Sequence, residues 1–93
     1  MRSDNGGGTV SEYRIEVRIT PRDGLLDPEG KAVEHALHSL SFDGVGNVRV
    51  GRLIRLRIRA ADRDDAQRKV DEMCRKLLAN PVTENYAIAL EEA

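Results

Sequence analysis

The stretch YRIEVRIT, residues 13–20, carries the clearest structural signal in this chain. Apolar side chains alternate with charged or polar ones, which predicts a β-strand with one buried face. Residues 53–60 (LIRLRIRA) repeat the alternation, and residues 85–90 (NYAIAL) form a third candidate strand. The residues predicted to face inward are Tyr13, Ile15, Val17, Ile19, Ile54, Leu56, Ile58, Tyr86, Ile88 and Leu90. On the other side of the last strand, Ala87 and Ala89 are small enough for another layer or chain to approach closely.

Two amphipathic helices are expected between these strands. The first begins with Asp27 as N-cap and Pro28 at the first helical position, and it stops near Ser41. Its apolar residues are Val33, Ala36, Leu37 and Leu40. Asp62 caps the second helix, whose apolar stripe comprises Ala66, Val70, Met73, Cys74 and Leu77. Asn80 fits a left-handed position after that helix, and Pro81 prevents its continuation.

The segment between the first helix and residue 53 is expected to be extended. Residues 45–50 are rich in valine, and Gly51-Arg52 predicts a tight turn or a bulge. A hairpin and one long bent strand are both compatible with this pattern. The predicted fold is α+β, a β-α-β-β-α-β two-layer sandwich with a mainly antiparallel sheet. Both helices are expected on one face of the sheet, and the domain is expected to dimerise through the sheet.

Length and composition limit what this chain can be. Ninety-three residues allow one domain, expected at residues 12–93, after a polar tail at residues 1–11 that contains Gly6-Gly7-Gly8. A core of this size is thin, and a single cysteine provides no internal disulfide, so oligomerisation is the expected extra source of stability. The formal charge of −1 argues against a dedicated nucleic-acid binder. The sequence has no long apolar run and no signal-peptide pattern, which predicts a cytoplasmic protein without a membrane segment.

No residue set in the sequence indicates catalysis, cofactor binding or metal binding. Cys74 lies on an apolar helix stripe, where a core thiol is a better interpretation than a nucleophile. His35 and His38 lie on neighbouring helical turns but lack further metal ligands nearby. The acidic pairs at residues 64–65 and 91–92 are better explained by a helix start and a solvated tail.

Two features call for a physical explanation. Gly30 lies in the first turn of the first helix, at about 1 kcal/mol less favourable helix propensity than alanine. Close approach of another backbone, from this chain or from a partner, would explain it. Arg55, Arg57 and Arg59 form a positive row on one strand face. Pairing with Glu16 and other acids on neighbouring strands, or with a partner chain, explains this row better than nucleic acid does, because RNA-binding sheets stack bases on aromatic residues.

Three motifs, in this order, resemble the PurS subunits of phosphoribosylformylglycinamidine synthase. The first is the Leu-Leu-Asp-Pro-x-Gly segment that ends at Gly30. The second is Val48-Arg49-Val50-Gly51-Arg52, and the third is Leu-Leu-Ala-Asn-Pro-Val at residues 77–82. Each motif alone is weak, but the three at this spacing in a chain of this length are specific. The resemblance covers about residues 13–91.

The resemblance implies a non-catalytic adaptor in purine biosynthesis. In this family the synthase is divided into three proteins, and this chain is expected to act as an enzyme only as part of that complex. The large subunit PurL binds ATP, with Mg²⁺ expected there, and amidates formylglycinamide ribonucleotide; the glutaminase PurQ releases ammonia from glutamine. A PurS dimer or tetramer bridges them and assists ammonia transfer, binding no cofactor itself. The candidate structural or interface positions are Asp27, Pro28, Gly30, Gly51, Arg52, Asn80 and Pro81.

Three other functions fit parts of this pattern less well. A stand-alone ligand-sensing module of the ACT type shares the β-α-β-β-α-β order and dimerises through sheets. An RNA-binding sheet is disfavoured by the scarcity of aromatic residues, two tyrosines and one phenylalanine. An independent enzyme lacks a nucleophile–base pair in the sequence.

Overall fold

The computed structural model describes residues 10–24 and 27–93. Residues 1–9, which make up most of the predicted tail, lie outside the described residues, as do Leu25 and Leu26 of the first motif. The elements in chain order are β1 (Ser11–Pro21), α1 (Pro28–Ser39), β2 (Arg52–Ala60), α2 (Arg63–Met73), η1 (Cys74–Leu78) and β3 (Glu84–Glu92).

The sheet is built around the strand with the strongest alternation. β1 is central in the order β2-β1-β3, and both neighbours run antiparallel to it. Ile15 pairs with Leu56 on one side and with Leu90 on the other, so inward-facing residues of all three strands share one face. The predicted strands and their inward faces are therefore confirmed, as is the antiparallel α+β class.

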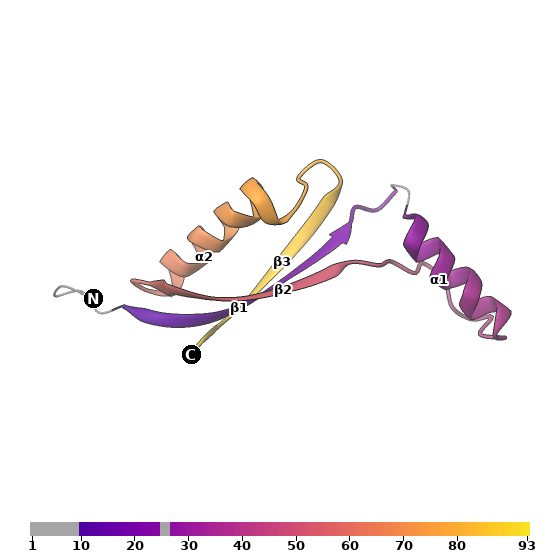
Figure 1. Cartoon of the computed structure of the whole chain (residues 1–93), viewed down its shortest axis with the longest axis horizontal. Coiled ribbons are helices and arrows are strands. Elements are labelled where there is room, and N and C mark those ends of the chain that lie inside the picture. Colours follow the sequence, from indigo (N-terminus) through magenta and orange to yellow (C-terminus); the bar gives the residue numbers. More distant parts are fainter. Residues whose placement is uncertain (1–9, 25–26) are drawn as a thin grey trace.

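The core lies between this face of the sheet and α2 (Figure 1). Four alternate side chains of β1 are buried, and Ala66, Val70 and Cys74 of the second helical segment pack on them. Asp62 caps α2 as predicted, accepting a hydrogen bond from the Asp65 amide at 2.8 Å. The Tyr86 hydroxyl also donates to the Asp71 carboxylate, which fastens α2 to β3.

The last turn of the second helix differs from the prediction. η1 is a π-helical turn in which the Ala79 amide donates to the Cys74 carbonyl at 3.0 Å, five residues earlier. This wider turn rotates Leu77 outward, where its side chain is 82% exposed, and Leu78 packs against the core instead. The left-handed conformation predicted for Asn80 is also wrong, because the positive-φ residues other than glycine within the described parts are Ser41 and Asn47. Ala79, in an extended conformation, ends the helix.

The position predicted for the first helix is wrong. α1 forms at the expected residues and Asp27 caps it, but it lies beyond the end of the sheet instead of covering its face (Figure 1). We call residues 27–50, which comprise α1 and the segment that returns to β2, the arm. The arm makes the molecule elongated, with a radius of gyration of 18.1 Å against about 12 Å for a compact domain of this length.

The extra strand predicted near residues 45–50 is also absent from the described parts of the chain. These residues run back along α1 without a strand partner. The amides of Val48 and Val50 instead donate to the side chains of Glu34 and Asp27, both contributed by the arm. The observed order is β-α-β-α-β, with three strands and two α-helices in the described residues. Neither a hairpin nor one long bent strand forms there.

Candidate functional site

The seven candidate positions gather where the arm meets the sheet. Three of them precede or begin an element: the N-cap of α1, the residue before β2 and the first residue of β2. Two lie in the first turn of α1, and two follow η1. They are Asp27, Pro28, Gly30, Gly51, Arg52, Asn80 and Pro81. Two polar networks, one around Asp27 and one around Arg52, account for most of them.

Asp27 joins the two sides of the arm. One carboxylate oxygen, Oδ1, accepts from the Gly30 amide at 3.1 Å, and the other, Oδ2, accepts from the Val50 amide at 3.1 Å. A Cβ at Gly30 would overlap the Val48 carbonyl oxygen and the Asp27 carboxylate. The predicted close approach of another backbone is therefore made by this chain's own return segment.

Further contacts brace the arm along its length. The Val48 amide donates to Glu34 Oε1 at 3.3 Å, and His38 Nε2 donates to the Val45 carbonyl at 2.6 Å. At the root, the Arg49 guanidinium donates to the Arg22 carbonyl at 3.2 Å. α1 and its return segment thus form one braced unit. The role of Glu34 was not predicted, because a glutamate on the polar side of a helix carries no sequence signal of a partner fourteen residues later.

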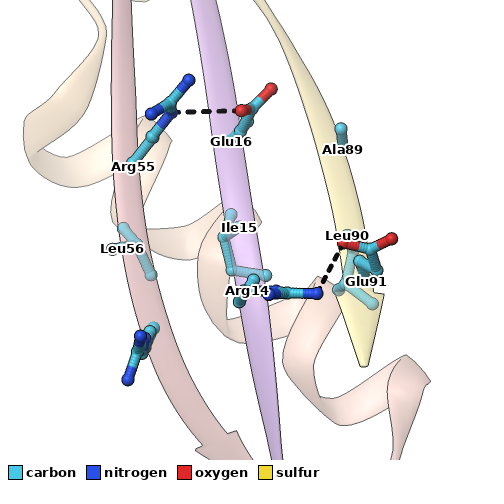
Figure 2. A pocket seen from close by; sticks show the side chains of 9 residues that line it. Arg14, Ile15, Glu16, Arg55, Leu56, Ala89, Leu90 and Glu91 are labelled. Atoms are coloured by element: carbon cyan, nitrogen blue, oxygen red, sulfur yellow. Dashed lines mark hydrogen bonds and ion pairs between the residues drawn. The ribbon is translucent and has the colours of Figure 1, made fainter. Parts of the chain in front are cut away.

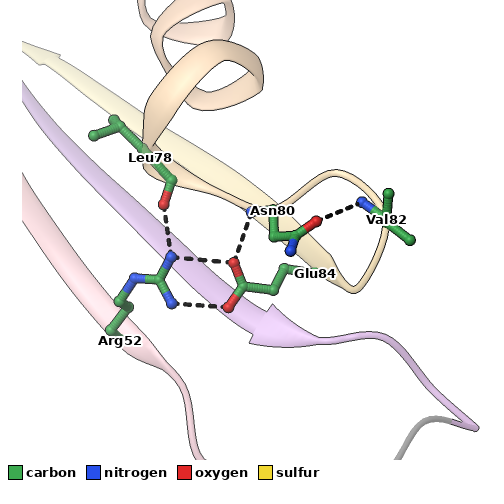
Figure 3. A network of polar contacts seen from close by, with 5 residues as sticks. All are labelled: Arg52, Leu78, Asn80, Val82 and Glu84. Carbon is green, nitrogen blue, oxygen red and sulfur yellow. Dashed lines mark hydrogen bonds and ion pairs between the residues drawn. The ribbon is translucent and has the colours of Figure 1, made fainter.

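Arg52 organises the opposite side of the junction (Figure 3). Its guanidinium donates to both Glu84 carboxylate oxygens, at 2.8 and 3.1 Å, and to the Leu78 carbonyl at 2.7 Å. The Asn80 backbone amide also donates a hydrogen bond to Glu84 Oε1 at 2.8 Å. The hydrogen bond from Arg52, followed by that from the Asn80 amide, lowers the pKa of Glu84 below its ordinary value. This network ties the starts of β2 and β3 to the end of η1.

The remaining junction positions shape the backbone. A Cβ at Gly51 would overlap the Ile19 carbonyl oxygen of β1, so the predicted turn or bulge is a close strand approach. The Asn80 side chain accepts from the Val82 amide at 3.0 Å, which closes a short turn. The Pro81 carbonyl accepts from the Arg22 guanidinium at 2.7 Å. All these contacts are structural, and none exposes a reactive group.

Cys74 and the histidines do not form a catalytic arrangement in the described residues. The Cys74 side chain is buried, and burial, with a smaller effect from Asp71, raises the pKa of its thiol. His38 is engaged by the Val45 carbonyl. Across residues 10–24 and 27–93, no group of three or more His, Cys, Asp or Glu side chains could hold a metal ion. No helix in these ranges has the length and apolar character needed to cross a membrane.

The arm exposes apolar side chains that this chain does not cover. Val33, Leu40 and Phe42 are 42%, 67% and 55% exposed. Several exposed apolar side chains on one segment of the chain often mark an interaction surface. The apolar stripe of α1 was predicted correctly, but its burial against the sheet was not.

The second candidate surface is the sheet face opposite α2, which we call the open face (Figure 2). Its charged side chains are Arg14, Arg18, Arg55, Arg57, Arg59, Glu12, Glu16 and Glu91. The predicted pairing of Arg55 with Glu16 is confirmed at 3.1 Å, and Arg14 pairs with Glu91 at 3.1 Å. The role of Arg14 was missed because strand register cannot be read from alternation alone.

Comparison with known proteins identifies relatives over nearly the whole domain. The family model PurS, described as phosphoribosylformylglycinamidine (FGAM) synthase, matches residues 14–92. The FGAM synthase subunit PurS of Bacillus subtilis is 45% identical over 80 residues, covering 86% of this chain and 94% of that protein. A solved B. subtilis PurS structure aligns with a TM-score of 0.76 at 45% identity, covering 86% of this chain and 99% of that one. A chain in the structure of PurLQS from Thermotoga maritima aligns with a TM-score of 0.78 at 28% identity, covering 88% and 98%. These matches give no support to the ACT-like alternative.

Proposed function

The chain belongs to the PurS family of FGAM synthase subunits, and from this premise we propose that it is the adaptor that joins the synthetase subunit PurL to the glutaminase PurQ. It is thereby a component of a ligase complex of purine biosynthesis. The observation that carries the proposal is the likeness to a chain of the T. maritima PurLQS structure over 88% of this sequence. Joining the two partners keeps the ammonia-releasing and ammonia-consuming sites together, so the adaptor assists ammonia transfer.

In this proposal the chain contributes no catalytic residue and binds no cofactor. The buried Cys74 thiol, with its raised pKa, is a poor nucleophile, which supports an adaptor role. ATP and Mg²⁺ belong to the synthetase subunit. In this proposal the protein acts in the cytoplasm, where an unpaired cysteine stays reduced. Residues 12–93 form the single adaptor domain.

We further propose that a second copy of this chain covers the arm. α2 covers the centre of a three-stranded sheet, and Ile54, Leu56 and Ile58 of the edge strand β2 stay half-buried beside it. A 12-residue helix such as α1 is about 18 Å long and would fit beside α2. The arm directs its own α1 away from this place (Figure 1). In a dimer, the α1 of one chain would lie on the sheet of the other, which would form a layer of two helices, one from each chain.

Reconstitution with PurL and PurQ from the same organism tests the adaptor function. We expect glutamine-dependent formation of FGAM to require this chain, because ammonia must pass between two proteins. With ammonium salt as the nitrogen source, the synthetase should work without it, and the isolated chain should be inert. Equal use of glutamine without this chain, together with no complex on a sizing column, would overturn the proposal.

A further inference from the structure

The open face of the sheet carries a positive charge that the rest of the chain does not share. Its charged side chains are five arginines and three glutamates, a surplus of two positive charges, whereas the whole chain has a formal charge of −1. The arginines are solvent-exposed, Arg55 at 75% and Arg18 at 70% of the side chain. The sheet thus separates a basic face from a more acidic remainder.

The cross-strand register leaves part of this charge unbalanced. Arg14 of the central strand lies directly opposite Arg57 of β2, and like charges at such positions repel. Glu91, on the other side of Arg14, is bonded to Arg14 itself at 3.1 Å. Within the described residues, no carboxylate forms an ion pair with Arg57. A carboxylate from outside the chain would relieve the repulsion between the two arginines.

The same face is shaped to receive protruding side chains. A shallow depression of about 770 Å³ is lined by Arg14, Glu16, Arg55, Arg57, Ala89 and Glu91. Figure 2 shows the two ion pairs, Arg55 with Glu16 and Arg14 with Glu91, on either side of it. Ala89 is a small residue at its edge on β3, so an incoming backbone can come close there.

We propose that the open face docks a net acidic protein surface on another subunit of the same complex, with Arg57 as the principal contact. This inference rests on the proposed adaptor function. A second copy of this chain does not fit the face, because two surfaces with the same positive surplus would repel. A polynucleotide fits poorly too, because Glu12, Glu16 and Glu91 interrupt the arginines and would repel phosphates. A face with mixed charges and a net positive charge is complementary to a protein surface with mixed charges and a net negative charge.

The test is the charge reversal Arg57→Glu. The new glutamate would lie opposite Arg14, where it can form a cross-strand ion pair, so the variant should fold at least as well as the parent. Its affinity for the PurL–PurQ partners, measured by titration calorimetry, should fall by about tenfold or more. The parent's affinity should weaken steeply with added salt, and the variant's less so. Arg68→Glu, the same change on the outer side of α2, is the matched control and should bind normally.

The outcomes separate this inference from the proposed function. If the parent chain binds neither partner, the adaptor function fails. If the parent binds and Arg57→Glu binds equally well with an unchanged oligomeric state, the docking face is wrong while the adaptor function stands. A gel shift with single-stranded RNA at physiological salt tests the nucleic-acid alternative. RNA binding that is lost in Arg57→Glu, without loss of subunit binding, would overturn the docking proposal in favour of nucleic acid.

Discussion

Replacing Gly30 with alanine tests how the arm is held together. The added Cβ would overlap the Val48 carbonyl oxygen and the Asp27 carboxylate, so one of them must move. Movement of Asp27 strains or breaks its bonds to the Gly30 and Val50 amides, each 3.1 Å long. Lost hydrogen bonding and overpacking together are worth about 2–3 kcal/mol. Alanine returns about 1 kcal/mol of helix propensity, so the net loss is about 1–2 kcal/mol.

Native-state hydrogen exchange measures this loss where it arises. The Val48 and Val50 amides both bond to arm side chains, and their protection should fall by about 5- to 30-fold in Gly30→Ala. The matched control is Gly44→Ala, where a Cβ would meet no atom within 4 Å. That change should leave protection the same or slightly higher, because alanine narrows the unfolded ensemble. Equal protection in the two variants would refute the claim that the return segment makes Gly30 necessary.

Three further outcomes follow from contacts already described. Because the pKa of Glu84 is lowered, its pairing with Arg52 stabilises the fold at pH values above the ordinary glutamate pKa, about 4.3. This stability is lost as pH falls toward the lower folded-state pKa. Melting curves of Glu84→Gln should therefore change less between neutral and acid pH than those of the parent. Cys74→Ala should cost about 1–2 kcal/mol in urea denaturation through a small cavity, with glutamine-dependent activity of the complex retained. A large loss of activity without unfolding would show that the thiol has a chemical role. Leu40→Ser, at the C-cap of α1, should dissociate the proposed dimer in analytical ultracentrifugation while leaving the circular dichroism unchanged, whereas Lys31→Ala within α1 should not; equal dimerisation of both variants would contradict the placement of the arm.

Local patterns predicted the strands and caps because both depend on neighbouring residues. The alternation at residues 13–20 predicts which side chains of β1 are buried, and all four residues predicted to face inward are buried. Asp27 and Asp62 both cap helices, since an aspartate before a helical run satisfies free amides wherever the helix lies. These features need no knowledge of distant parts of the chain.

The wrong predictions concern which surface covers the apolar side of a helix and where the α-helix gives way to a π-helical turn. The apolar stripe of α1 predicts that Val33 and Leu40 are buried against some surface. Periodicity cannot tell whether that surface is this chain's own sheet or another chain. Valines at residues 45–50 indicate extended backbone, yet a strand also requires a neighbour with free hydrogen-bonding groups. The π-turn after Met73 adds a residue to one turn, which exchanges the roles of Leu77 and Leu78 without a local sequence signal. Local cap and turn signals marked the junction positions, but their contacts depend on strand register, which such signals do not contain.

The central place of β1 has a consequence for how the chain folds. The nearest residues paired between β1 and β2, Ile19 and Arg52, are 33 positions apart, and Pro21 and Glu84, the nearest pair between β1 and β3, are 63 apart. No strand can therefore pair with its neighbour through a short hairpin, and every step of sheet assembly closes a long loop. Such high contact order places folding in the millisecond-to-second range, slower than for helical domains of this size. During that interval β1 has both edges open, and its alternating arginines and glutamates oppose aggregation until β2 and β3 arrive.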